Sequence, residues 1–228
     1  MPELVALAGG AFVMGDDAGR ADERPAHRVG VAAFRAAVRP VSNAEYDAFV
    51  AATGHEASPF RDDPRFAGDE RPVAGVSWFD AVAYCEWLSS VSGVAFRLPT
   101  EAEREYAARG GIEGSAWPWG NDAPQSRPEL RAIVSLGQPH VPGPECANAY
   151  GLRCMVDNLH EWCSDWYAPD YYASSPQNAP TGPETGRRRA SRGGSWRHMI
   201  KFNRLAARSS LDPTYRYNDY GFRVYANA

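Results

Sequence analysis

The sequence lacks several features that would point to common partners. No apolar run approaches about 18 residues, the usual minimum for a membrane span, so we expect no membrane partner. A surplus of basic residues is also missing, since 24 Lys and Arg face 28 Asp and Glu, and this balance predicts no nucleic-acid partner. The N-terminal residues, MPELVALAGGAFVMG, have no basic stretch and few apolar residues, so they do not resemble a signal peptide, and we expect a cytoplasmic protein.

Cysteine is scarce, and its placement argues against two kinds of site. Cys85, Cys146, Cys154 and Cys163 form no CxxC pair and show no Cys/His spacing suited to zinc. Without a secretory signal we expect reduced thiols rather than disulfides.

The glycine-rich stretch GGAFVMG lacks the Lys of a P-loop and the GxGxxG spacing before a helix, so we expect no nucleotide cofactor.

Three helix starts are present. Each is a capping box, in which Ser or Thr is followed three residues later by an acidic residue. The pairs are Ser42 with Glu45, Ser77 with Asp80, and Thr100 with Glu103. Apolar residues at helical spacing follow the first two, and glycines after the first and third segments predict where those helices end.

The rest of the chain consists mainly of short, interrupted segments. HRVGVAAFR (27–35) and YGFRVYA (220–226) predict strands, whereas 112–145 and 168–190 are rich in Pro, Gly and polar residues. With 21 Gly and 18 Pro and no obvious linker, the sequence predicts one α+β domain over residues 1–228 with long loops.

Eleven motifs then occur in the order in which one family carries them. They are GGAFVMG (9–15), ERPAHRV (23–29), VSNAEYDAFV (41–50), PVAGVSWFDAVAYCEWL (72–88), RLPTEAEREYAARGG (97–111), WPWGN (117–121), NAYGL (148–152), NLHEWCSDW (158–166), RGGSW (192–196), AARSS (206–210) and YGFRV (220–224). Through them the sequence resembles the formylglycine-generating enzymes, also called sulfatase-modifying factors, over nearly its whole length. The resemblance implies a loop-rich α+β variant of the C-type lectin fold, built around a twisted antiparallel core.

The chain departs from this family at the catalytic cysteines. Formylglycine-generating enzymes carry two cysteines shortly after RGGSW, and their thiolates hold the Cu(I) that activates oxygen. Here no cysteine follows Cys163, and the aligned positions hold His198 and Asn203. Because Cu(I) prefers thiolates to an imidazole and an amide, formylglycine formation by the usual route is not expected.

The segment 191–210 nevertheless keeps the turn that the family uses for chemistry. We assign three candidate catalytic residues to it: Ser195, His198 and Asn203. Four more residues are assigned to substrate binding: Trp196, Arg197, Phe202 and Arg204. Arginine forks bind carboxylates and phosphates, so an anionic ligand is expected. The simpler alternatives are that His198 only bridges a loop, that Trp196 and Phe202 belong to the core, and that two further arginines, Arg208 and Arg223, pair with buried acids.

The family resemblance also implies a structural calcium ion. Relatives coordinate Ca²⁺ through an Asn or Asp side chain, backbone carbonyls and a Glu. In this sequence Cys154 occupies the first ligand position, Glu161 is retained, and Asp157 offers an oxygen from another direction. We therefore assign Glu161 and Asp157 as candidate calcium ligands, although sulfur itself does not suit this hard cation.

A transition metal is the other candidate cofactor. His160 replaces a Trp of the family, and together with His198 and one of Glu161, Asp165 or Asp219 it could form the His/carboxylate grouping that binds Fe(II). The sequence thus suggests an oxidoreductase that modifies a peptide or small-molecule substrate with Fe(II) or Cu. This hypothesis agrees with relatives that serve in ergothioneine biosynthesis and siderophore oxidation. The alternative is a non-catalytic, lectin-like binding module for an anionic peptide or protein partner; no oligomeric state is predicted.

Overall fold

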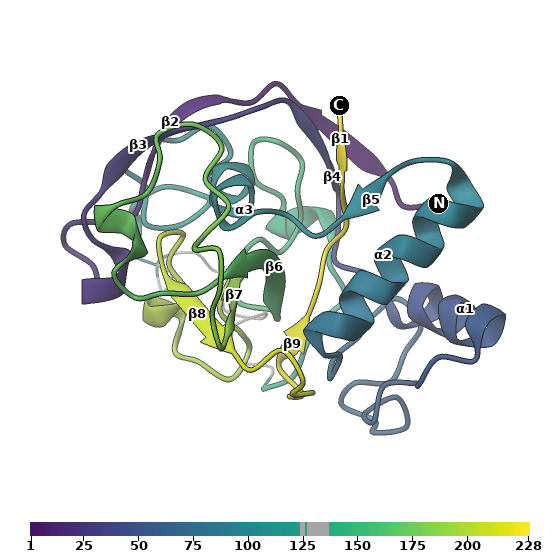
Figure 1. The fold of residues 1–228 in the computed structure, drawn as a ribbon. Helices are drawn as coiled ribbons and strands as arrows, with labels where there is room; N and C mark the ends of the chain where they lie inside the picture. Colours follow the sequence, from purple (N-terminus) through teal and green to yellow (C-terminus); the bar gives the residue numbers. More distant parts are fainter. Residues whose placement is uncertain (124–125, 127–136) are drawn as a thin grey trace.

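A computed structural model of the chain describes residues 1–123, 126 and 137–228. Its helices and strands, in chain order, are β1 (Leu4–Leu7), β2 (Gly10–Met14), η1 (Ala21–Glu23), β3 (His27–Val31), β4 (Phe34–Ala37), α1 (Asn43–Thr53), α2 (Trp78–Ser92), β5 (Phe96–Arg97), α3 (Glu101–Arg109), η3 (Pro144–Cys146), β6 (His160–Trp166), η4 (Tyr171–Ala173), β7 (Arg189–Arg192), η5 (Ile200–Phe202), β8 (Arg208–Leu211), β9 (Tyr220–Gly221) and β10 (Tyr225–Asn227). The η elements are short 3-10 helices. Long irregular segments connect these elements, as expected from the Gly and Pro content (Figure 1).

The strands of the described residues form two four-stranded sheets and one two-stranded pair. The first sheet has the order β1-β4-β10-β5 and is antiparallel throughout. The second has the order β8-β7-β6-β9, in which only β6 and β9 run parallel. In Figure 1, α1 and α2 lie together at one side, and α3 lies between the β2–β3 pair and the sheet of β6, β7 and β8. This arrangement confirms the α+β prediction.

All three predicted capping boxes form, and each helix ends at a glycine in the left-handed conformation. At the start of α1, the Ser42 hydroxyl accepts a hydrogen bond from the Glu45 N–H, and the Glu45 carboxylate accepts one from the Ser42 N–H. These bonds satisfy N–H groups that have no partner within the helix. Local sequence therefore sets the helix boundaries.

Each of the two predicted strands is in fact divided between two sheets. HRVGVAAFR contributes β3 to the two-stranded pair and β4 to the first four-stranded sheet, and YGFRVYA contributes β9 and β10 to different sheets. Between β9 and β10 the backbone bonds elsewhere, since the carbonyls of Phe222 and Val224 accept from the N–H groups of Val41 and Ala37. Part of the predicted irregular stretch 112–145 lies outside the described residues; 112–123 and 137–145 are irregular apart from η3.

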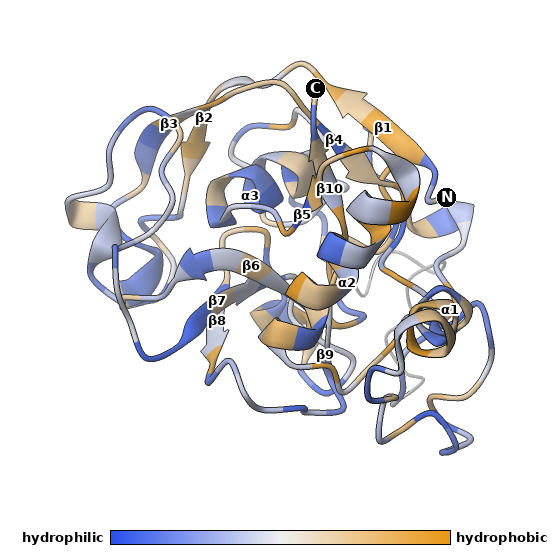
Figure 2. Ribbon diagram, turned by 45° about the vertical axis from the view of Figure 1, so that its right-hand side comes forward, coloured by the Kyte–Doolittle hydropathy of each residue, from blue (hydrophilic) through white to orange (hydrophobic). Residues whose placement is uncertain are grey.

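Helix α3 is hydrophilic and yet almost completely buried. Figure 2 shows it as largely hydrophilic in the middle of the molecule, in contrast to the hydrophobic strand β1. Every residue of α3 except Tyr106 is buried, including its Glu and Arg side chains. Buried charges must be paired to be tolerated, so this helix needs partners on the segments around it.

None of the described helices has the length and apolar character needed to cross a membrane.

Candidate functional site

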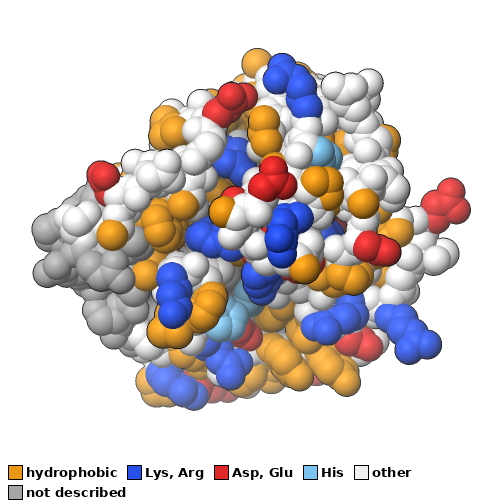
Figure 3. Space-filling model, turned by 90° about the vertical axis from the view of Figure 1, so that its left-hand side faces the viewer, with side chains coloured by type: hydrophobic (Ala, Val, Ile, Leu, Met, Phe, Trp, Pro, Cys, Tyr) orange, Lys and Arg blue, Asp and Glu red, His pale blue; other side chains and the backbone are white. Residues whose placement is uncertain are grey.

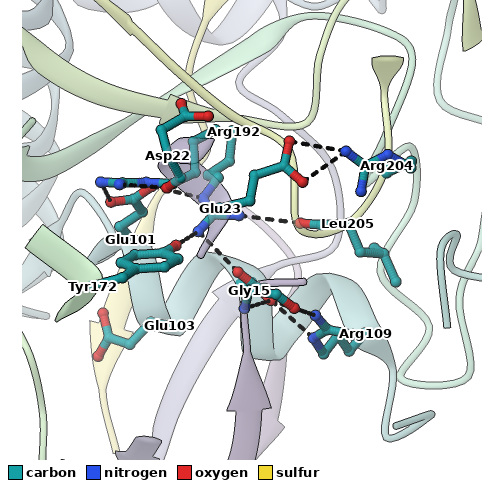
Figure 4. A network of polar contacts seen from close by, with 12 residues as sticks. Gly15, Asp22, Glu23, Glu101, Glu103, Arg109, Tyr172, Arg192, Arg204 and Leu205 are labelled. Atoms are coloured by element: carbon teal, nitrogen blue, oxygen red, sulfur yellow. Dashed lines mark hydrogen bonds and ion pairs between the residues drawn. The ribbon is translucent and has the colours of Figure 1, made fainter. Parts of the chain in front are cut away.

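Arg192, the last residue of β7, is held by acidic residues of α3 (Figure 4). Its Nε lies 2.9 Å from Glu101 Oε1, and its Nη2 lies 2.8 Å from Glu105 Oε2. Arg208 of β8 binds the same Glu101 carboxylate through Nε at 2.8 Å and Nη2 at 2.9 Å. Burial alone would raise the pKa of Glu101, but the positive charges of Arg208 and Arg192 outweigh it and hold that pKa below its usual value. This network fixes the start of the turn after Arg192 and confirms that Arg208 is structural.

The turn that follows requires its two glycines. Gly193 and Gly194 have φ angles of 96° and 64°, a region that other residues adopt at a cost. A Cβ on Gly194 would lie 2.0 Å from the Asn203 side-chain oxygen. The Gly193 carbonyl accepts from the Asp157 N–H at 2.9 Å, which ties the turn to the segment before β6. The direction in which the next residues leave the turn is therefore fixed.

Beyond the turn, two histidines and a carboxylate converge. His160 is the first residue of β6, His198 lies in the loop after the turn, and Asp219 directly precedes β9. Because β6 and β9 pair in parallel, the His160 N–H donates to the Asp219 carbonyl at 2.9 Å. One donor atom from each of the three side chains lies within 4.8 Å of the others. Of the carboxylates considered from the sequence, Asp219 is the one that the structure places beside both histidines.

His160 is in the state that metal ligation requires. The residue is 4 % exposed, and its Nδ1 has no hydrogen-bond partner among the described residues. Burial lowers its pKa to about 3, and the neighbouring His198, Arg20 and Arg197 side chains act in the same direction. The imidazole is therefore neutral at physiological pH and keeps a free lone pair, as a metal ligand must.

Asp219 is oriented by the turn and keeps one oxygen free. Its Oδ2 accepts a hydrogen bond from the Ser195 hydroxyl at 3.1 Å. Its Oδ1 is buried, accepts no hydrogen bond from the described residues and lies 3.5 Å from Arg197 Nη1. Ser195 also lies 3.5 Å from His198 Nδ1, so one buried hydroxyl contacts two of the three candidate ligands. The sequence placed Ser195 among the catalytic residues; in the structure it positions other side chains.

His160 and His198 lie between two neighbouring cavities of about 370 and 220 Å³. The larger is also lined by Arg188 and Arg197, and the smaller by Arg20, Arg208 and Phe202. The space-filling view in Figure 3 shows one face of the molecule on which basic side chains gather, with histidine exposed among them. An anion in these cavities would meet several guanidinium groups.

Two of the residues assigned to substrate binding lie at the cavities, and two do not. Arg197 and Phe202 line the cavities and are each about half exposed. Trp196 is partly buried and packs on Phe66 at a ring distance of 5.9 Å, against a small hydrophobic cluster, and it lines neither cavity. Arg204 binds Glu23 at 2.6 Å, a pair visible in Figure 4, and Asp16 at 2.8 Å, and it is part of the scaffold.

Asn203, which the sequence placed among the catalytic residues, is completely buried. Its side-chain amide donates to Asp157 Oδ1 and, at 3.0 Å, to the Ser195 carbonyl. Asn203 therefore supports the turn from behind instead of facing His198. Burial raises the pKa of Asp157 to about 7, and the hydrogen bond from Asn203 only partly opposes this.

The surroundings of Glu161 do not fit calcium. Its two carboxylate oxygens lie 2.8 Å from Arg104 Nε and 3.0 Å from Arg223 Nη2, and all three side chains are buried. Ca²⁺ is bound by six to eight oxygen ligands, whereas this carboxylate is surrounded by positive charge. The structure gives no support to a calcium ion at Glu161, and it confirms that Arg223 pairs with a buried acid.

The structure also reveals a cluster that the sequence did not predict. All four cysteines are free thiols, and two of them, Cys146 and Cys154, lie with His140 so that one donor atom from each is within 4.8 Å of the others. The neighbouring Cys154 lowers the pKa of the Cys146 thiol, whereas burial raises that of Cys154. Five and seven residues separate these positions along the chain, and such intervals do not match the short Cys/His spacings used to find zinc sites.

Comparison with known proteins identifies the family. The sequence model of one protein family, the sulfatase-modifying factor enzyme 1-like domain, matches residues 1–228. The chain belongs to this family. The formylglycine-generating enzyme of Streptomyces coelicolor is 37 % identical over 96 % of this chain and 87 % of its own length. A protein of Chlamydia pneumoniae, named serine/threonine-protein kinase pkn1, is 33 % identical over the whole of this chain, which spans only 38 % of that relative.

A solved structure supports the same assignment. The structure of PvdO from Pseudomonas aeruginosa is 30 % identical and matches with a TM-score of 0.86, over 100 % of this chain and 95 % of PvdO. The predicted formylglycine-generating-enzyme-like variant of the C-type lectin fold is thereby confirmed. This member of the sulfatase-modifying factor family keeps the RGGSW turn but places His198 after it, beside His160 and Asp219.

Proposed function

We propose that this chain is a metal-dependent oxidoreductase in which His160, His198 and Asp219 bind Fe(II) and the neighbouring cavities bind an anionic peptide or small metabolite. The convergence of these three donors within 4.8 Å carries the proposal. Two histidines and one carboxylate, with the remaining coordination positions open, are the ligand set of non-haem Fe(II) oxygenases. The cavities of about 370 and 220 Å³ beside the histidines leave room for a substrate.

Bound Fe(II) would supply one-electron chemistry with oxygen, and the protein side chains would bind and orient the reactants. Ser195 holds Asp219 through a 3.1 Å hydrogen bond and so fixes the direction of its free oxygen. Burial keeps His160 neutral. Arg197, half exposed and 3.5 Å from Asp219, is loosely held and can turn toward a substrate carboxylate or phosphate.

The positions and the free state of the cysteines support two further expectations, one about formylglycine formation and one about location. Because the chain has no cysteine after Cys163, we expect no conversion of the cysteine in a CxPxR peptide to formylglycine when the protein is supplied with Cu(I), oxygen and a reductant. Mass spectrometry would detect the product, and conversion above trace yield would contradict the expectation. The four free thiols favour a reducing compartment, so we propose a cytoplasmic location.

Fe(II) binding under anaerobic conditions tests the metal site directly. We expect the wild-type chain to bind one Fe(II), and His198→Ala to lose most of this affinity with little change in melting temperature, since His198 is exposed. His55→Ala is the control, because His55 pairs with Asp80 on α2, away from the cluster. Equal binding by wild type and His198→Ala, or no binding by wild type, would contradict the proposal. Oxygen consumption by the Fe(II)-loaded protein with ascorbate measures redox activity.

A non-catalytic binding module is the second candidate, and the observation that supports it is the composition of the cavity walls. Arg188 and Arg197 line the larger cavity together with Tyr217, and Phe202 lines the smaller one. Exposed aromatic and guanidinium groups are typical of peptide-binding surfaces. In this case the metal-free protein would bind an anionic peptide, and Arg197→Ala would weaken binding by about 1.5 to 3 kcal/mol. A requirement for Fe(II) in that binding would exclude this candidate.

A further inference from the structure

A second group of metal-binding side chains lies outside the site described above. Cys154 Sγ is 3.2 Å from His140 Nε2, and the Cys146 sulfur completes a group of three donor atoms within 4.8 Å. His140 and Cys154 are buried, and Cys146 is partly buried. The three residues line a separate cavity of about 100 Å³, together with Trp119, Met155 and other residues.

Local backbone structure brings the two cysteines together. Ala147 and Arg153 form an isolated antiparallel bridge, which sets the flanking residues Cys146 and Cys154 opposite each other. The Cys154 N–H donates to the Cys146 carbonyl at 3.1 Å. Cys154 itself has a φ angle of 51°, in the left-handed region that side chains rarely adopt. Such backbone conformations persist where the surrounding structure imposes them, and they are concentrated at functional sites.

The histidine is held in place independently of the cysteines. Asn158 accepts from the His140 N–H at 3.2 Å and donates to the His140 carbonyl at 3.1 Å. The ring atom Nδ1 of His140 is buried and has no hydrogen-bond partner among the described residues. The ring thus directs Nε2 at the Cys154 sulfur while no other described group uses its second nitrogen.

We propose that His140, Cys146 and Cys154 bind one Zn²⁺ ion, with the fourth coordination position directed toward the 100 Å³ cavity. Zinc takes Cys and His ligands in tetrahedral geometry at about 2.0 to 2.3 Å, which places ligand atoms about 3.3 to 3.8 Å apart. Donor atoms within 4.8 Å reach these separations by small side-chain rotations. Binding displaces one proton from each thiol, and two thiolates with a neutral imidazole leave the buried Zn²⁺ complex uncharged.

The competing use of this pair is a disulfide between Cys146 and Cys154. The structure holds both residues as free thiols, so the zinc complex and the disulfide are alternative fates of the same two sulfurs. A bound Zn²⁺ would protect both thiols from oxidation, because each sulfur would then be a ligand. Oxidation in the presence and absence of zinc therefore separates the two possibilities.

The experiment titrates the reduced, metal-free full chain with Zn²⁺ against a chromophoric chelator, and with Co²⁺ to observe thiolate-to-cobalt charge-transfer absorption. To count the cysteine cluster alone, the zinc titration is carried out in a His198→Ala background. In the His198→Ala background, where both cysteines are intact, we expect one Zn²⁺ per chain and, with Co²⁺, a thiolate-to-cobalt charge-transfer band. Adding Cys146→Ser should remove the band and reduce affinity by more than the roughly 10- to 100-fold typical of losing an outer-shell partner. Cys85→Ala is the matched control, since Cys85 is a buried free thiol within α2.

Three results would overturn the proposal. One is the absence of zinc binding by the reduced chain. Another is an unchanged Zn²⁺ affinity when Cys146→Ser is added to the His198→Ala variant. The third is formation of the Cys146–Cys154 disulfide at the same rate with and without saturating Zn²⁺. Because none of these readouts depends on Fe(II), failure here is distinguishable from failure of the proposed oxidoreductase site.

Discussion

Replacing Glu161 by glutamine removes the charge that joins two buried arginines. The side chains of Arg104, Glu161 and Arg223 are 1 %, 1 % and 0 % exposed, so water cannot replace the lost carboxylate. Glutamine keeps the size of the side chain but turns one acceptor oxygen into a donor that faces a guanidinium. Two positive charges are then left without a buried counter-ion.

The expected cost follows from this burial. Removing one partner of a buried ion pair destabilises a protein by about 3 to 5 kcal/mol. At about 2.1 cal/mol/K per residue, the entropy of unfolding of 228 residues is about 0.5 kcal/mol/K, so Glu161→Gln should lower the melting temperature by roughly 6 to 10 °C. Denaturant titration and thermal unfolding monitored by circular dichroism measure both quantities.

The matched control is Glu56→Gln. Glu56 also pairs with an arginine, Arg216, at 2.6 Å, but its side chain is 73 % exposed. Exposed pairs contribute about 0 to 1 kcal/mol, so this variant should unfold almost like the wild type. If Glu161→Gln costs no more than Glu56→Gln, the buried network does not stabilise the fold in the way described.

The same variant predicts a pH effect. Burial alone would raise the pKa of Glu161, but Arg104 and Arg223 outweigh it, so the pKa is lower in the folded state than in the unfolded chain. A lowered folded-state pKa stabilises the protein above the unfolded pKa of about 4.3, and that stability is lost as the pH falls toward the folded value. The difference in unfolding free energy between wild type and Glu161→Gln should therefore shrink below about pH 4.

Two further predictions concern Asp165 of β6 and Gly194 in the turn after Arg192. Burial raises the pKa of Asp165 to about 7, above its unfolded value of about 3.9, so its contribution to stability is lost as the pH rises from about 4 to about 7. Asp165→Asn should flatten this part of the stability profile, and an unchanged profile would contradict the assignment. Gly194→Ala should lower the free energy of unfolding, measured by denaturant titration, by about 1 to 3 kcal/mol. The reason is that the added Cβ would lie 2.0 Å from the Asn203 side-chain oxygen at a φ angle of 64°. The control Gly54→Ala, at a φ of 72° with no atom within 4 Å, should cost less; equal costs would argue against the role of Asn203.

The sequence alone determined the features that depend on neighbouring residues. The capping boxes at Ser42, Ser77 and Thr100 form as predicted, because each is closed by hydrogen bonds between residues three positions apart. The order of the motifs was enough to predict the fold, and the missing cysteines were enough to predict a changed site. Each of these conclusions uses information contained in a few consecutive residues or in their order.

Tertiary structure decided which distant side chains meet. Asp219, rather than Asp165, lies beside His160 because β6 pairs with β9, and that pairing joins segments about 60 residues apart. Glu161 faces arginines of α3 and of the segment before β10, which no local pattern could show. Cys146 and Cys154 meet His140 only through a backbone bridge and a positive φ angle. The physical reason is that burial and charge pairing depend on the packing of whole elements, whereas spacing along the chain specifies only the contacts within one element.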